Sequence, residues 1–294
     1  MEKMSLKHIQ SIYMSHPIIK RVQIILSNQI NSLYFIVFYG IVSILFIAVL
    51  EFIARYNMNE FKDKLPIELF YWPTSNGFKI SIFLEEAGYP YNVNFVNISK
   101  GEQFEPSFLK ISPNNRMPAI IDPDGPSGQE ISIFESGAIL QYLGKKTGLF
   151  YPSDSRKQIE VDQWLFWQVG NLGPMAGQAH HFRNYSQTKI QYAIDRYTNE
   201  VNRLYGVFNK KLSDGREYIA DEYSIADMAC IGWVRNPDKK GQDLNDFPYL
   251  NDWFKRMMSR PAVIKGVALG GELHHDLSKD LEAQKILFGQ RATK

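Results

Sequence analysis

The sequence predicts a small α/β domain followed by an all-α domain, behind a segment with about the length of a transmembrane helix. Between Pro66 and Lys146, short apolar runs alternate with helical patterns, as in a small sheet with helices on its faces. Beyond about Arg156, only helical patterns remain. We therefore expect a polar segment at 1–30, a transmembrane helix at 31–55, the α/β domain at 66–147, the all-α domain at 156–276 and a tail at 277–294.

The N-terminal apolar run extends from Leu33 to Leu50 and contains 18 uncharged residues. A helix that spans a bilayer needs about 20 apolar residues, which an extension of the run through Ala54 supplies. Lys and Arg residues are balanced on the two sides of the run, so the positive-inside rule leaves its orientation open. The alternative is an upstream extension that is not part of the functional protein, with Met58 as the start. Both interpretations remain open.

The α/β domain begins with a strand, a turn and a helix. Ile67 to Tyr71 is a short apolar strand, and Pro73 to Gly77 has the residues of a turn and a helix cap. Lys79 to Ala87 then carries apolar side chains at helical spacing. Tyr91 to Asn97 has the alternating character of a second strand.

The same domain continues with a short helix, two strands and a closing helix. These are Pro106 to Lys110, Ala119 to Asp122, Ile131 to Phe134 and Glu135 to Lys146. The resulting order, βαβαββα, is that of the thioredoxin-like fold. Because many unrelated functions share this fold, the function has to be argued from individual sites.

The all-α domain is predicted from three helical runs and one helix start. The runs are Ile159 to Val169, Ile190 to Leu212 and Leu250 to Met258, of which the second is strongly amphipathic. Ser224 to Asp227 has the Ser-x-x-Asp pattern of a capping box. We interpret this box as a folding element without a catalytic role.

Charge and cysteine content exclude several classes of function. The chain has 33 Lys and Arg residues against 31 Asp and Glu residues, with no basic stripe, so we expect no nucleic-acid partner. Its single cysteine, Cys230, lies in an apolar run and cannot form an intramolecular disulfide. The adjacent His180 and His181 lack a third ligand at a suitable spacing, so we expect no metal site. Any thiol chemistry must use Cys230 alone or a thiol brought by a ligand.

Two junctions that lead into helices carry groups suited to bind anions. At the first, Thr74, Ser75 and Asn76 offer hydroxyl and amide donors that, with the helix dipole, stabilise a thiolate. At the second, Ser136 and the free N–H groups of the following helix suit a carboxylate, while Glu135 suits an ammonium. This second pair would hold the end group of an α-amino acid. Ordinary helix capping accounts for the same residues, and this alternative stays open.

Arg116, Met117 and Pro118 directly precede a predicted strand. Proline is allowed at the start of a strand, and a cis bond before it is the minority option. If the bond is cis, the backbone of Met117 is exposed and can pair with an extended peptide by strand addition.

These motifs, in this order, resemble the glutathione transferases, and in detail their bacterial Nu class. The resemblance covers Pro66 to about Gly270 and excludes the first 60 residues. It rests on the runs FYWPTSNGFKISIFLEEA, KGEQFEPSFLKISPNNRMPAI, FESGAILQYL, QWLFWQVGNLGPMAGQAHHF and YAIDRY. It implies the glutathione transferase fold, a homodimer, and a site for two glutathione thiols or one glutathione disulfide. It also implies reduction of small disulfides, weak transfer to electrophiles and reduction of organic hydroperoxides.

The resemblance implies roles for individual residues. Thr74 and Asn76 match the residues that contact the glutathione sulfur and take the catalytic role. The glutathione-binding positions match Gln103, Arg116, Met117, Pro118, Glu135, Ser136 and Arg196, the last of which reaches the partner subunit's site. Many transferases carry a catalytic Tyr at the end of the first strand. Here Phe70 stands in that register and Tyr71 points to the opposite face, so the hydroxyl role falls to Thr74.

The sequence thus predicts a glutathione-dependent enzyme whose bound thiolate reduces disulfides or conjugates electrophiles. The alternative is a non-catalytic binding or regulatory module tethered to a membrane. We expect the catalytic domain in the cytoplasm, anchored through Leu33 to Leu50 if that helix forms. The acceptor pocket is expected between the two domains, near Trp72, Trp167, Met175 and His181.

Overall fold

The computed structural model describes residue 42, residues 61–273 and residues 277–291. The chain divides into two units, Met1–Glu60 and Phe61–Lys294. Apart from residue 42, the expected span Leu33 to Leu50 lies outside the described residues and therefore stays a prediction. Within the described part of the chain, no helix combines the length and the apolar character needed to cross a bilayer.

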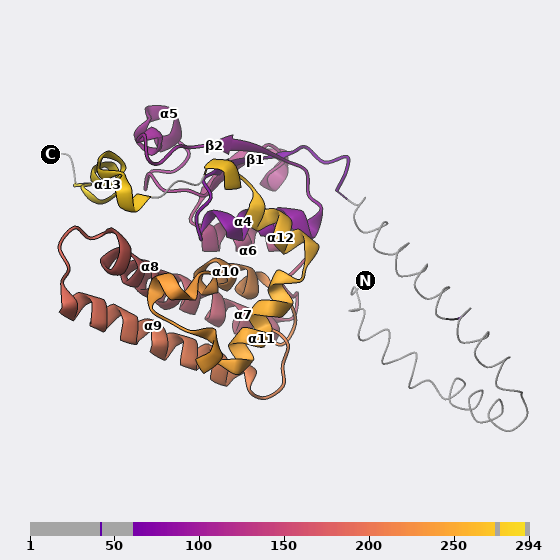
Figure 1. The fold of residues 1–294 in the computed structure, drawn as a ribbon. Coiled ribbons are helices and arrows are strands. Elements are labelled where there is room, and N and C mark those ends of the chain that lie inside the picture. The colour runs from indigo at the N-terminus through magenta and orange to yellow at the C-terminus, as the bar shows by residue number, and fades with distance from the viewer. Residues whose placement is uncertain (1–41, 43–60, 274–276, 292–294) are drawn as a thin grey trace, which may run out of the picture. The chain divides into compact units, whose positions relative to one another are not determined.

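A four-stranded mixed sheet forms one layer of the second unit (Figure 1). Its strands are β1 (Ile67–Tyr71), β2 (Tyr91–Phe95), β3 (Ala119–Asp122) and β4 (Ile131–Phe134), in the spatial order β2-β1-β3-β4. β1 pairs parallel with β2 and antiparallel with β3, which pairs antiparallel with β4. The parallel pair requires a crossover connection, which a helix supplies. Three strands have the expected limits, and β2 ends two residues early.

The helix α4 (Gly77–Ala87) provides this crossover and forms the centre of the unit. It packs against α6 (Ser136–Thr147), α10 (Ile225–Val234) and α12 (Pro261–Ala268). Figure 1 shows it between the sheet and the helical layer. Nine of its eleven residues are buried, so its surroundings are protein on almost every side. The short α5 (Pro106–Leu109) completes the α/β domain.

The helical layer also contains α7 (Ser155–Trp167), α8 (Gly173–His180), α9 (Gln191–Leu212) and α11 (Pro248–Met258). Two π-helical turns, η3 (Gln168–Leu172) and η4 (His181–Tyr185), precede and follow α8. The expected helices at Ile190 to Leu212 and Leu250 to Met258 are found as α9 and α11. The prediction of a thioredoxin-like domain followed by a helical domain is thereby confirmed.

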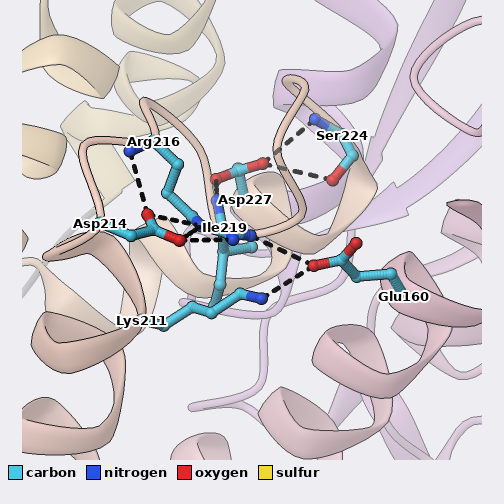
Figure 2. A network of polar contacts seen from close by, with 7 residues as sticks. All are labelled: Glu160, Lys211, Asp214, Arg216, Ile219, Ser224 and Asp227. Atoms are coloured by element: carbon cyan, nitrogen blue, oxygen red, sulfur yellow. Dashed lines mark hydrogen bonds and ion pairs between the residues drawn. The ribbon is translucent and has the colours of Figure 1, made fainter.

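A buried network anchors the start of α10 (Figure 2). The carboxylate of Asp227 accepts hydrogen bonds from the backbone N–H and hydroxyl of Ser224, the N–H of Ile219 and the indole of Trp253. The predicted capping box is thus present. Next to it in Figure 2, Glu160 pairs with Lys211 and Arg216. The two groups of contacts fix the loop that leads into α10.

The C-terminal residues that the sequence analysis treats as a tail include a further helix, α13 (Leu281–Phe288). Asp280 caps this helix by accepting a hydrogen bond from the N–H of Ala283. Beyond the helix, Gln290 accepts a hydrogen bond from Arg116 at 2.9 Å. The segment therefore lies beside one of the candidate site residues.

Candidate functional site

The turn between β1 and α4 carries Thr74 and Asn76, and both side chains are half-buried. The Thr74 hydroxyl oxygen accepts a hydrogen bond from the N–H of Gly77 at 3.2 Å. Because its oxygen is used in this way, the hydroxyl can donate its own proton to a ligand. No acceptor for that proton occurs among the described residues, and Asn76 makes no side-chain cap. The turn thus offers one hydroxyl and one amide at the start of a buried helix.

Close packing fixes the position of this turn. Ser75 donates a hydrogen bond from its hydroxyl to the carbonyl oxygen of Gly232 in α10, at 2.8 Å. A Cβ atom on Gly232 would lie 2.7 Å from the carbonyl oxygen of Ser75, so α10 approaches the turn more closely than other residues allow. Ser75 therefore holds the turn, while its two neighbours are the ones left to bind a ligand.

Tyr71, at the end of β1, packs its ring against the start of α4 and keeps its hydroxyl inside the protein. It is fully buried, and its hydroxyl donates to the carbonyl oxygen of Leu269 at 3.2 Å. Burial raises the pKa of Tyr71 well above its usual range, so the phenol stays protonated. The hydroxyl proton of Tyr71 is thus already used inside the protein, and the assignment of the hydroxyl role to Thr74 stays a prediction.

The loop before β3 contains a cis peptide bond between Met117 and Pro118. Ser112 supports the loop by donating from its hydroxyl to the carbonyl oxygen of Arg116 at 2.8 Å. The Arg116 side chain is exposed and reaches Gln290. From the sequence alone a cis bond before proline is the minority option, but the structure contains it.

Gln103 differs from the other candidates because it is only 1% exposed. Its amide nitrogen donates to the carbonyl oxygen of Ile98 at 3.3 Å, and its buried amide oxygen has no hydrogen-bond partner among the residues that the structure describes. The side chain therefore supports the loop around Gly101 in this conformation. The structure does not bring it to an open surface with Thr74.

Glu135 and Ser136 stand at the start of α6. Glu135 has φ of 70° and ψ of 111°, a conformation that costs about 1–3 kcal/mol for a residue other than glycine. Its exposed carboxylate accepts a hydrogen bond from Asn114 at 3.3 Å. Ser136 is nearly buried, and the first N–H groups of the helix have no intrahelical acceptor. A carboxylate and an ammonium can therefore be bound side by side at this helix start.

Lys79 is a polar residue of this site that the sequence analysis did not identify. It lies on α4 and is 1% exposed, and its ammonium donates to the Ser136 hydroxyl oxygen at 3.1 Å and to Gln168 Oε1 at 2.5 Å. Burial lowers the pKa of Lys79 to about 7, and the nearby carboxylate of Glu135 opposes this shift. Cys230 is itself fully buried, and burial raises the pKa of its thiol.

Arg196 lies on α9. Its side chain is exposed and pairs with Glu200, four residues further along the helix, at 3.8 Å. Within the described part of this single chain, no contact joins it to another candidate residue. Its expected role at the partner subunit's site therefore stays a prediction.

Two hollows lie against α13. The first, of about 840 Å³, is lined by residues that include Phe104, Arg116, Lys285 and Gln290. The second, of about 480 Å³, is lined by residues that include His181, and the His181 ring lies 4.5 Å from that of Phe288. Among the described residues, no three His, Cys, Asp or Glu side chains gather as metal ligands would.

Comparison with known proteins defines the class to which this fold and site belong. The N-terminal domain model of the glutathione S-transferases matches residues 65–145, and their C-terminal domain model matches residues 174–261. The chain therefore belongs to the glutathione S-transferase family, which confirms the resemblance inferred from its motifs.

Three proteins that are similar to this chain illustrate the relationship. Disulfide-bond oxidoreductase YfcG of Escherichia coli is 50% identical over 67% of this chain and 92% of its own length. Transcriptional regulator URE2 of Saccharomyces cerevisiae is 38% identical over 67% of this chain and 65% of its own. A glutathione transferase structure from Pseudomonas putida, with one glutathione disulfide bound per subunit, is 38% identical with a TM-score of 0.66. It covers 73% of this chain and 97% of its own.

Proposed function

We propose that this protein uses the thiolate of bound glutathione to reduce small disulfides and, with the same thiolate, to conjugate electrophiles. The observation that carries the proposal is the Thr74 hydroxyl, whose oxygen accepts from Gly77 while its proton remains available at the start of α4. A donor in this position stabilises a thiolate and lowers the pKa of the thiol. Cys230 takes no part, because it is fully buried.

The remaining candidates bind the γ-glutamyl end and the peptide backbone of the glutathione molecule. Glu135 and Ser136 bind the ammonium and carboxylate of its γ-glutamyl group. The backbone of Met117, before the cis proline, pairs with the extended peptide. Thr74 and Asn76 contact the sulfur. Gln103 contributes indirectly, through the loop that it supports from inside.

Disulfide reduction takes two steps that balance in atoms and electrons. The glutathione thiolate attacks one sulfur of the substrate disulfide, and the other sulfur leaves as a thiolate that takes a proton from water. A second glutathione thiolate then attacks the mixed disulfide and releases the second substrate thiol, forming glutathione disulfide. The bound glutathione disulfide in the Pseudomonas putida relative supports this end point.

Two further properties belong to the same proposal. The thiolate also attacks an oxygen of a hydroperoxide and breaks the O–O bond, which gives an alcohol and a glutathione sulfenic acid; a second glutathione thiol then displaces water from the sulfenic acid and forms glutathione disulfide. The protein acts as a homodimer, and exposed apolar residues of α7 support this: Ile159 is 59% and Phe166 is 63% exposed. They stand seven positions apart and so share one face of the helix. Such a face suits burial against a second copy.

A non-catalytic regulatory module is the second candidate, favoured by the similarity to the transcriptional regulator URE2. A module of this kind needs to bind glutathione but not to activate it.

The location of the protein follows from its dependence on glutathione: we propose a catalytic domain in the cytoplasm, where the glutathione pool lies. Anchoring through Leu33 to Leu50 remains a proposal from the sequence.

Steady-state kinetics with the full-length protein test the two candidates. Glutathione is supplied with a small disulfide, a hydroperoxide or an aromatic halide, and each rate is compared with the uncatalysed reaction. We expect the disulfide to be reduced fastest, with weaker activity on the other two. Glutathione binding without turnover of any of the three would favour the regulatory module.

A further inference from the structure

A lysine ammonium is held inside the protein directly behind the proposed carboxylate site. Lys79 of α4 is 1% exposed, and its nitrogen lies 3.1 Å from the hydroxyl oxygen of Ser136. Its second partner is Gln168 Oε1 of the π-helical turn η3, at 2.5 Å. Lysine is almost never fully buried without a partner of opposite charge, and both of these partners are neutral.

The geometry determines which way the Ser136 hydroxyl points. A charged ammonium has three donors and no acceptor, so Ser136 must accept from Lys79 with its oxygen. The serine proton is then donated in another direction, and the helix start with its free N–H groups is where an anion would receive it. A neutral amine could instead accept that proton and draw the hydroxyl inward. The charge of Lys79 therefore decides whether Ser136 serves as a donor to the ligand.

The titratable groups that face Lys79 come from the neighbouring elements. Cys230 of α10 faces Lys79 as a neutral thiol, because burial raises its pKa. Glu135 ahead of α6 raises the pKa of Lys79, while η3 contributes the neutral Gln168. The one charged residue of α12 is Lys265, and it pairs with Glu85 at 2.8 Å. Burial is the largest influence on Lys79 and lowers its pKa to about 7. Its charge thus changes within the physiological pH range.

We propose that Lys79 is a positioning residue that holds Ser136 as a donor to the γ-glutamyl carboxylate and makes glutathione binding depend on pH. This inference rests on the proposed function, because it concerns the same glutathione site. An anionic ligand favours the charged lysine, so binding is tightest below about pH 7 and takes up a proton above it. Raising the pH through about 7 weakens binding as the charge is lost.

Calorimetric titration of the full-length protein with S-methylglutathione tests the proposal, since this ligand has no thiol to ionise. Affinity is measured from about pH 6 to about pH 8.5 for the wild type and for Lys79→Met. The ligand's own ammonium titrates in both experiments, so the difference between the proteins reports Lys79. We expect Lys79→Met to bind about tenfold more weakly at pH 6, and the difference to shrink as the pH rises.

Lys240→Met is the matched control. Lys240 is also buried with a pKa lowered to about 8 by burial, but its ammonium donates to the carbonyl oxygens of Arg235 and Asn236. We expect this variant to keep the wild-type pH profile. If Lys79→Met does not fold, Ser136→Ala carries the same test, because it keeps Lys79 but removes the hydroxyl through which it acts.

The outcomes separate this inference from the proposed function. Wild-type binding with an unchanged pH profile in Lys79→Met, or in Ser136→Ala where that variant stands in for it, would overturn the role of Lys79 and leave the proposed function intact. A wild type that does not bind S-methylglutathione at any pH would overturn the proposed function and this inference together.

Discussion

Thr74 and Ser75 are adjacent hydroxyl residues to which the structure gives different roles. The oxygen of Thr74 accepts from Gly77, whereas the hydroxyl of Ser75 is used to hold α10 through Gly232. Only the first has a proton to offer a ligand. The thiolate chemistry proposed for this protein therefore depends on one side chain rather than on the polarity of the turn.

Replacing Thr74 by Ala should lower the rate of disulfide reduction by about tenfold or more, because each pKa unit regained by the glutathione thiol removes about tenfold of its thiolate. Glutathione affinity should change much less, since the contacts to its γ-glutamyl group and its peptide backbone remain. Initial rates at saturating glutathione measure the effect. Ser75→Ala is the control, and it should affect stability more than rate; an equal loss of rate in both variants would contradict the assignment.

Cys230 provides a second test at the residue scale. It is fully buried in α10, and burial raises the pKa of its thiol, so it is neither reachable nor ionised. Cys230→Ala should therefore reduce disulfides at the wild-type rate per folded molecule. A variant that folds but has lost its activity would show that the protein's own thiol takes part.

Sequence reasoning could select Thr74, Glu135 and Ser136 as candidates, because turn residues before a helix are a local pattern. It could not identify Lys79 as part of the site. The partners of Lys79 lie 57 and 89 positions away in the sequence, and a lysine on a predicted helix is ordinarily on its exposed face. The inward direction of Gln103 likewise depends on how its loop folds back toward Ile98.

At the scale of elements, the buried carboxylate of Asp227 holds the start of α10. All four groups that surround the Asp227 carboxylate are donors, two to each oxygen. The side-chain amide of an asparagine in its place would direct its own N–H groups at some of these donors, where there is no acceptor for them. Asp227→Asn is therefore a severe change in spite of its similar shape.

We expect Asp227→Asn to lower the free energy of unfolding by about 3 kcal/mol or more, because it leaves buried donors without an acceptor. Asp154→Asn is the matched control. Asp154 caps α7 by accepting from the N–H of Lys157 at 3.0 Å at an exposed position, and Asn caps helices about as well as Asp. Urea unfolding compares the two, and similar losses would contradict this account of the network.

The pKa of the Asp227 carboxyl leads to a prediction about how the stability of the protein depends on pH. Burial raises the pKa of Asp227 from 3.8 to about 6, although its hydrogen bonds oppose this. Because the folded-state pKa lies above the unfolded one, its contribution to stability is fully present below about pH 4 and is lost as the pH rises through about 6. The indole N–H of Trp253 donates to this carboxylate, so its NMR resonance should titrate with a midpoint near pH 6.

Element limits were predictable where the pattern is local. The strands Ile67–Tyr71, Ala119–Asp122 and Ile131–Phe134 begin and end as expected, because apolar runs and turn residues bound them. The π-helical turns around α8 have no such signal: the helix expected at Ile159 to Val169 runs into the first of them, and α8 itself is not predicted. The packing of α13 beside Arg116 depends on contacts between distant residues, which a sequence pattern does not contain.

At the scale of the whole molecule, the apolar face of α7 predicts assembly. Light scattering should give twice the mass of one chain for the wild type. Ile159→Glu with Phe166→Glu should give a monomer, because two charges would be buried in the interface. Ile264→Glu, on the exposed part of α12, is the control and should remain a dimer. A monomeric wild type would contradict the homodimer.

The central claim is that the fold activates a thiol which the ligand supplies. Thiolate absorbance, followed as glutathione bound to the full-length protein is titrated with base, tests it most directly. We predict that the bound thiol of the wild type ionises well below the ordinary thiol pKa of about 8.5, and that Thr74→Ala returns it toward that value. A thiol that ionises in the wild-type site with its free pKa would contradict the account.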